Sequence, residues 1–177
     1  EGQPIRTDGP ASHLQTKRGT PTMGGVIILL SFFLTTLLWA DLTNPYVWVL
    51  IFSTLGFSAL GAYDDYLKLT KRSSSGISSS SKFLWQVIIG GTTTYIVMYL
   101  SAPELSTKIA LPFLKDYFID LGYFFIPWGI LVLVGASNAV NLTDGLDGLV
   151  TVPIILVAAC FCLITYLVGN QIFANYL

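Results

Sequence analysis

Charge is scarce in this chain of 177 residues, because 11% of them are charged and 53% are hydrophobic. Soluble domains carry about 25% charged residues, and a globule of this size could not cover its surface with so few. The formal net charge of −1 and the lack of a basic tract give no indication of a nucleic-acid partner. The composition therefore indicates a protein that lies within a membrane.

Histidine and cysteine are also rare, which excludes two kinds of site. His13 is the single histidine, so a site built on several histidines cannot exist within this stretch. Cys160 and Cys162 lie in an apolar run, with a spacing that fits neither a zinc knuckle nor a disulfide framework. We interpret them as small apolar packing residues.

Five apolar stretches are each long enough to cross a bilayer, which takes about 20 residues of helix. No signal-peptide pattern precedes the first, so we expect the stretches themselves to direct insertion. Their apolar residues continue all round, and helices satisfy their own backbone polar groups in lipid. We predict an all-α, polytopic membrane protein, with residues 1–177 forming a single membrane domain. The predicted spans are about 23–40, 46–62, 83–100, 121–137 and 149–168, with Pro127 kinking the fourth.

Basic residues set the orientation, since Lys and Arg gather in the short cytoplasmic loops of membrane proteins. With the N-terminal segment in the cytoplasm, seven basic residues lie on that side and two, Lys108 and Lys115, on the other. Residues 1–22, 63–82 and 138–148 are then cytoplasmic. We predict a flexible serine-rich loop over 73–81 and a short amphipathic helix in the interface over 101–120.

The first polar cluster precedes the first span. Thr20 followed by Pro21 is typical of a helix N-cap with proline at the first helical position. Such a helix start binds anions, phosphate above all, and Lys17 stands just before it. The Gly24-Gly25 pair leaves room for a ligand to approach closely. An ordinary capped helix with flanking cytoplasmic charges explains the same residues.

The second cluster places two carboxylates, Asp64 and Asp65, at the cytoplasmic end of the second span. Adjacent carboxylates at a helix C-terminus repel each other and face the negative end of the helix dipole. Lys68 lies four residues after Asp64 and can neutralise its charge, but this pair does not explain why a second carboxylate stands at Asp65. Mg²⁺ would explain both, because it binds carboxylate and substrate phosphate oxygens.

The third cluster lies between the fourth and fifth spans. Asn138, Asn141, Asp144 and Asp147 recur every three residues, so a helical turn would align them along one polar edge. A polar turn between two spans is the plain alternative, although two amides and two carboxylates exceed what a turn requires. Together, the three clusters on one membrane face favour metal-assisted phosphoryl transfer.

These motifs resemble one enzyme family closely. GTPTMGG at 19–25, the Asp64-Asp65 pair and NAVNLTDGLDGL at 138–149 resemble the phospho-N-acetylmuramoyl-pentapeptide transferases. These enzymes form part of the polyprenyl-phosphate N-acetylhexosamine-1-phosphate transferases. The resemblance implies transfer of phospho-N-acetylmuramoyl-pentapeptide from UDP to undecaprenyl phosphate in the bacterial inner membrane, with Mg²⁺ as cofactor and lipid I and UMP as products.

The resemblance also implies roles for individual residues. Asp64 and Asp65 match the family's catalytic pair and would bind the metal. The residues that match its substrate-binding positions are Lys17, Thr22, Asn141, Asp144 and Asp147.

Three features depart from the family, and other functions stay open. The family spans the membrane ten times, and its further metal-binding aspartate and its histidine-rich loop are not in this chain, so we expect a fragment that is inactive alone. Transfer of N-acetylglucosamine-1-phosphate to the same lipid is the nearest alternative. An ion or proton transporter, or a structural subunit, is more distant. A homodimer or a regulatory protein partner stays open.

Overall fold

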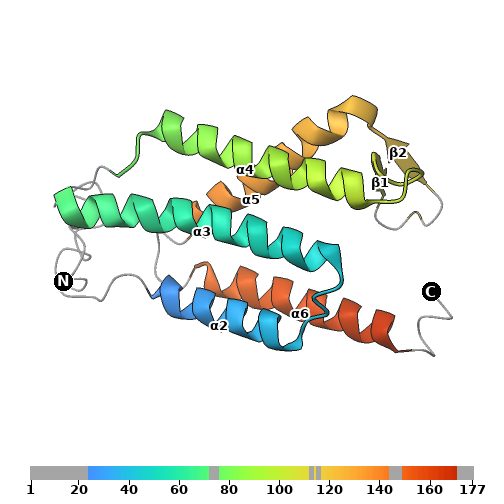
Figure 1. Cartoon of the computed structure of the whole chain (residues 1–177), viewed down its shortest axis with the longest axis horizontal. Coiled ribbons are helices and arrows are strands. Elements are labelled where there is room, and N and C mark those ends of the chain that lie inside the picture. Colours follow the sequence, from blue (N-terminus) through green and yellow to red (C-terminus); the bar gives the residue numbers. More distant parts are fainter. Residues whose placement is uncertain (1–23, 72–75, 112–113, 115–116, 144–148, 171–177) are drawn as a thin grey trace. The chain divides into compact units, whose positions relative to one another are not determined.

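The computed structural model describes residues 24–71, 76–111, 114, 117–143 and 149–170. It divides the chain into two compact units, residues 1–134 and 135–177. Figure 1 follows the elements in chain order. They are α2 (Gly25–Trp39), α3 (Pro45–Lys71), α4 (Ser79–Leu100), β1 (Lys108–Ala110), β2 (Phe118–Asp120), the 3-10 helix η1 (Gly122–Phe124), α5 (Phe125–Thr143) and α6 (Thr151–Gly169).

Four helical stretches of the described residues are long and apolar enough to cross a bilayer: Pro45–Lys71, Ser79–Leu100, Gly122–Thr143 and Thr151–Gly169. The fifth, α2, is apolar but shorter, with 15 residues. These helices confirm the predicted helical, multi-pass membrane architecture. Large apolar side chains cover their outer faces, as contact with lipid requires.

Helix α3 continues well beyond the predicted span of 46–62, because it ends only at Lys71. Its last turns contain no glycine or proline, and Lys68 and Lys71 there complement the negative end of the helix dipole. With 27 residues, it is about 40 Å long, whereas the hydrocarbon of a bilayer is about 30 Å thick. The helix is therefore longer than the hydrocarbon is thick, and the two aspartates lie inside the helix rather than at its terminus.

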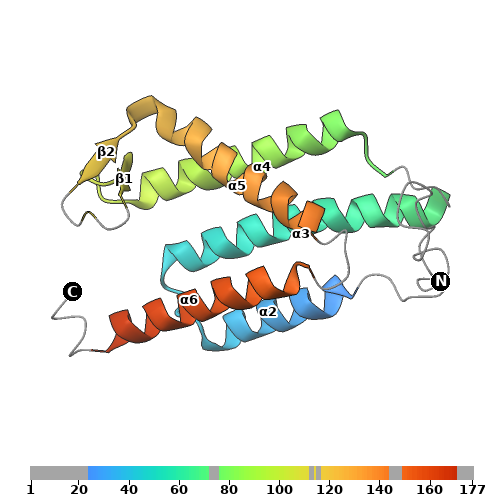
Figure 2. The ribbon, with the colours of Figure 1, turned by 180° about the vertical axis from the view of Figure 1, so that it is seen from behind.

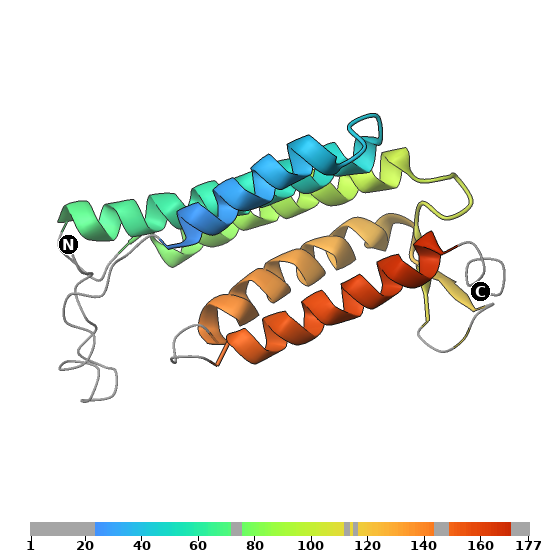
Figure 3. The same ribbon diagram turned by 90° about the horizontal axis from the view of Figure 1, so that it is seen from below.

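Helices α2, α3 and α4 of the first unit follow one another in antiparallel order (Figure 3). Asn44 precedes Pro45 at the start of α3 and accepts a hydrogen bond from the Tyr46 amide at 3.0 Å. Asn44 thus caps the start of α3 with its side chain, as asparagine often does. Pro45 occupies the first helical position, where proline is favoured. Gly56 lets α3 approach α4, since a Cβ there would come within 2.9 Å of the Ile89 side chain.

The beginning of α5 crosses α4 closely within the same unit (Figure 2). A Cβ on Gly90 would lie 3.7 Å from Leu133 and from Val134, and a Cβ on Gly129 would collide with the side chain of Thr94. The Thr94 hydroxyl donates to the Gly90 carbonyl at 2.8 Å, so it is satisfied within its own helix. Small residues at this crossing permit the close backbone approach on which membrane helices rely.

The predicted kink at Pro127 falls at the start of α5 and not within the helix. Pro127 lies in the first turn of α5, which begins at Phe125. The amides of a first turn have no partner within the helix, so the missing N–H of proline costs nothing there.

The predicted amphipathic helix over 101–120 is wrong, because part of this segment forms a two-stranded antiparallel hairpin. Lys108 pairs with Asp120, and Ile109 with Ile119. The Thr107 hydroxyl and the Gly122 amide both donate to the Asp120 carboxylate, at 2.7 and 2.9 Å. These two bonds, the hydroxyl first, lower the pKa of Asp120 below its usual range. Gly122 adopts a φ of +48°, which a residue with a side chain rarely does.

The second unit contains the end of α5 and all of α6. None of the residues of α6 is buried by this chain, and its apolar side chains are exposed along the whole helix. Cys160 and Cys162 are exposed free thiols, so their predicted role as packing residues has no support within the described residues.

We expect Gly129→Ala to lower the stability of the full-length protein in detergent by about 1–3 kcal/mol, because the added methyl overpacks the contact with Thr94. The thermal unfolding midpoint measures this. The control is Gly135→Ala in the same helix, where an added Cβ meets nothing within 4 Å. Equal midpoints for the two variants would contradict the tight crossing of α4 and α5.

Candidate functional site

The two adjacent carboxylates of α3 have different surroundings. Consecutive helical residues point about 100° apart, so they cannot share one face. The Asp64 side chain is 10% exposed and the Asp65 side chain 39% exposed. Asp64 therefore faces the protein, while Asp65 remains accessible from outside.

Lys68 lies one turn further along α3 and pairs with both carboxylates. Its Nζ is 2.6 Å from Asp64 Oδ2 and 3.2 Å from Asp65 Oδ1. The predicted i,i+4 pair with Asp64 is confirmed. The expectation that Lys68 leaves Asp65 without a partner is wrong, because residues three and four apart on a helix both come within reach of one long side chain.

The turn between α3 and α4 and the first turn of α4 each supply a further partner to Asp64. The Ile77 amide donates to Asp64 Oδ1 at 2.8 Å, and Lys82 Nζ lies 3.9 Å from Asp64 Oδ2. Both oxygens of the buried carboxylate are thus engaged. Gly76 makes this possible, because a Cβ at that position would collide with the Asp64 carboxylate.

The predicted flexible loop over 73–81 is wrong for its second half, and residues 72–75 lie outside the described residues. Ser78 is the N-cap of α4, and its Oγ accepts from the Ser81 amide at 3.3 Å. The remaining serines, 79–81, belong to the helix. Serine is a favoured N-cap residue, so the same composition that predicts a loop also starts a helix.

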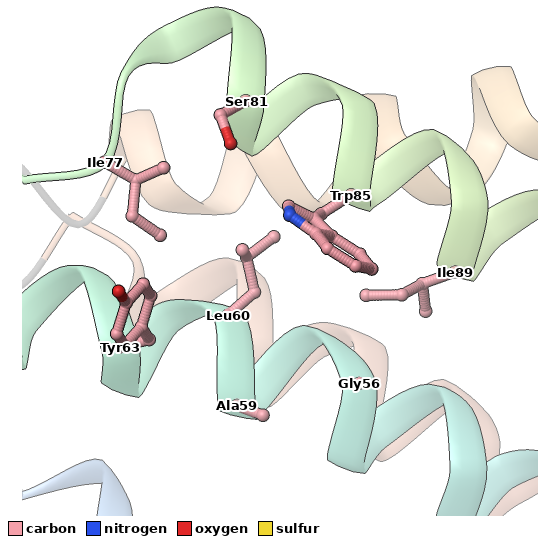
Figure 4. Close-up of a pocket in the computed structure, with 8 residues that line it drawn as sticks. All are labelled: Gly56, Ala59, Leu60, Tyr63, Ile77, Ser81, Trp85 and Ile89. Atoms are coloured by element: carbon pink, nitrogen blue, oxygen red, sulfur yellow. The ribbon is translucent and has the colours of Figure 1, made fainter.

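An apolar groove runs between α3 and α4 beside the carboxylates, with a volume of about 320 Å³. Figure 4 shows Tyr63 and Ile77 at one end of it and Gly56 and Ile89 at the other. The polar end is adjacent to Asp64, since Tyr63 precedes it in α3 and the Ile77 amide binds it. The remaining lining residues are Ala59, Leu60, Ser81 and Trp85.

The metal-binding capacity of this end of α3 depends on its two carboxylates. The described residues contain no group of three or more His, Cys, Asp or Glu side chains that could enclose a metal. Mg²⁺ is usually held by one or two carboxylates together with substrate phosphates and water. Asp65 fits that requirement better than Asp64, because its side chain is more exposed and has fewer partners.

The other predicted site residues are only partly described. Lys17, Thr22, Asp144 and Asp147, like His13 and the predicted cap at Thr20-Pro21, lie outside the described residues. Asn141 is exposed in the last turn of α5, and Asn138 precedes it by one turn, so these amides belong to a helix and not to a connecting loop. The polar edge from Asn138 to Asp147 and the meeting of the three clusters at one site stay predictions.

Comparison with known proteins gives the family. The sequence profile of glycosyl transferase family 4 matches residues 47–177, and signature 1 of the phospho-N-acetylmuramoyl-pentapeptide-transferases matches residues 17–29. This chain belongs to glycosyl transferase family 4. The match covers α3 with both aspartates and all the helices that follow it.

Curated relatives named phospho-N-acetylmuramoyl-pentapeptide-transferase agree with this assignment. The protein of Rhodopseudomonas palustris is 53% identical over 177 residues, all of this chain and 49% of the relative. That of Granulibacter bethesdensis is 54% identical over 176 residues, 99% of this chain and 49% of the relative. That of Pelagibacter ubique is 53% identical over 174 residues, 98% of this chain and 48% of the relative. The chain spans about half the length of the curated relatives it matches.

Sequence reasoning missed three members of the Asp64 environment: Gly76, the Ile77 amide and Lys82. In the sequence, Lys82 is one of the seven basic residues that indicate the orientation of the membrane protein. A single glycine within a run of serines was the available signal for Gly76, since glycine permits close approach of a backbone. No sequence signal marks a backbone amide that donates across a turn.

We expect Gly76→Ala to destabilise the full-length protein by about 1–3 kcal/mol, since it displaces the Ile77 amide from a buried carboxylate. Thermal unfolding in detergent measures the loss. Gly61→Ala in α3 is the matched control, because a Cβ there meets nothing within 4 Å. A midpoint for Gly76→Ala at or above that of the control would refute the contact.

Proposed function

We propose that the full-length protein transfers phospho-N-acetylmuramoyl-pentapeptide from UDP to undecaprenyl phosphate, which yields lipid I and UMP. The observation that carries this proposal is the 53–54% identity to relatives of that name along nearly all of the chain. The signature over residues 17–29 includes Lys17 and Thr22, which we propose to bind the nucleotide sugar. We propose the same role for Asn141, Asp144 and Asp147.

The proposed reaction joins two anions, and their repulsion is the main obstacle. An oxygen of the lipid phosphate attacks the sugar-bearing phosphorus of the donor. The bond from that phosphorus to the UMP oxygen breaks as the new one forms. Mg²⁺, when bound, neutralises phosphate charge and stabilises the departing UMP.

The two aspartates contribute differently to this proposal. The exposure of Asp65 supports a role at the lipid phosphate or at the metal. Asp64 is the better candidate for organising the site, since its oxygens are held by Lys68 and the Ile77 amide. Lys17, eight residues before the first described helix in sequence, would add positive charge for the donor diphosphate.

A lipid-borne acceptor and a soluble donor require a site at the boundary between membrane and water. The position of Asp64 and Asp65 near the polar end of a helix longer than the hydrocarbon supports such a location. The excess of Lys and Arg on this side supports the cytoplasmic face, and we propose the bacterial inner membrane. The groove between α3 and α4 adds an apolar surface beside the carboxylates.

We expect the full-length protein to release UMP in a Mg²⁺-dependent reaction, and Asp65→Asn to lower kcat by about 10²–10⁴-fold, because the amide neither carries charge nor accepts a proton. Asp64→Asn should also lose activity. The control is Glu104→Gln in the exposed segment between α4 and β1, where loss of a charge should leave turnover unchanged. UMP release from radiolabelled donor measures the rates.

Donor choice separates the proposed function from its nearest alternative. Turnover of UDP-N-acetylglucosamine, without turnover of the muramoyl-pentapeptide donor, would establish the sister reaction instead. Ion flux in liposomes that survives replacement of both aspartates would indicate a transporter.

A further inference from the structure

Asp64 is the only charged side chain among the buried residues of the described part of the chain, at 7% exposure. A buried carboxylate is costly unless it is paired and hydrogen-bonded. Its partners come from two places: Lys68 from its own helix, and the Ile77 amide and Lys82 from the α4 side. The carboxylate is therefore held across two elements.

Among the described residues, the charges that contact Asp64 and Asp65 balance when Lys82 is included. Lys68 is shared between Asp64 and Asp65, so it neutralises one of the two negative charges. Lys82 Nζ, at 3.9 Å from Asp64 Oδ2, supplies the second positive charge. At this distance it acts as a point charge rather than as a hydrogen-bond donor.

The place of Lys82 in α4 is unfavourable for the helix itself. It is the fourth residue of a helix that begins at Ser79, and a cation near a helix N-terminus faces the positive end of the dipole. Its side chain is only 24% exposed, although a lysine at this end of the helix could extend into solvent. The pairing with Asp64 accounts for both observations.

We infer that Lys82 is a positioning residue of the transferase site, which holds Asp64 against the start of α4 and thereby leaves Asp65 as the carboxylate presented outward. The inference rests on the proposed function and assigns to α4 a part in it. Lys82 acts through Asp64 and does not itself contact a substrate. A small displacement of a catalytic group is enough to slow a reaction strongly.

The experiment is a double-mutant cycle in the full-length protein, with UMP release as the readout. Lys82→Met should lower kcat by about 10–100-fold and leave the KM for the nucleotide sugar within about threefold. Lys82→Arg, which keeps the charge, should retain most of the rate. In the Asp64→Asn background, Lys82→Met should cause less than about a twofold further loss, because the group it positions is already gone.

The control is Lys71→Met, which removes an exposed lysine from the end of α3. If Lys82→Met matches this control, or if its loss is the same with and without Asp64, the inference is overturned. A raised KM with unchanged kcat would make Lys82 a substrate-binding residue instead. Lys82→Gln, which is closer in polarity, replaces Lys82→Met if that variant does not fold.

A second readout separates this inference from the proposed function. If the unmodified protein releases no UMP, the proposed function fails. The thermal unfolding midpoints of the unmodified protein, Lys82→Met, Asp64→Asn and the double variant then still test the contact between Lys82 and Asp64. Non-additive midpoints would support the contact between Lys82 and Asp64. Additive midpoints would refute it.

Discussion

The buried Asp64 carboxylate is the interaction on which the polar end of the first unit depends. It accepts from the Ile77 amide and pairs with Lys68, with Lys82 nearby, so it joins α3 to the turn that follows and to the start of α4. Removing one partner of a buried ion pair costs more than the pair contributes, because the other charge is left uncompensated. The local geometry of α3 and α4 is therefore closely constrained here.

Because Asp64 is held in this way, the two adjacent aspartates of α3 have different surroundings. Asp64 and Asp65 are consecutive in a helix, so when Asp64 is held toward α4, Asp65 is turned by about 100° from it and is more exposed. The result is one carboxylate surrounded by donors and one that remains accessible. In the proposed reaction, the enclosed carboxylate would organise the charge and the exposed one would meet the phosphate-bearing substrates.

The helices and the aspartate pair could be predicted from the sequence, because they follow from apolar length and residue type. Sequence reasoning failed where a local pattern suits two structures. The serines at 78–81 are typical of a loop, yet Ser78 is the N-cap of α4. A proline in the interior of a helix breaks or kinks it. Pro127, however, lies in the first turn of α5, where proline is tolerated. The segment with β1 and β2 mixes apolar and charged residues as an amphipathic helix does, but its ends pair as strands.

The sequence alone determined that the chain is a helical membrane protein of this transferase family, because hydrophobic length and long motifs are properties of consecutive residues. Only the tertiary structure decided which aspartate is enclosed. That choice depends on Gly76, the Ile77 amide and Lys82, which lie 12, 13 and 18 residues beyond Asp64. They reach it because α3 and α4 pack antiparallel, and the folding of the turn brings a backbone donor and a cation to one carboxylate.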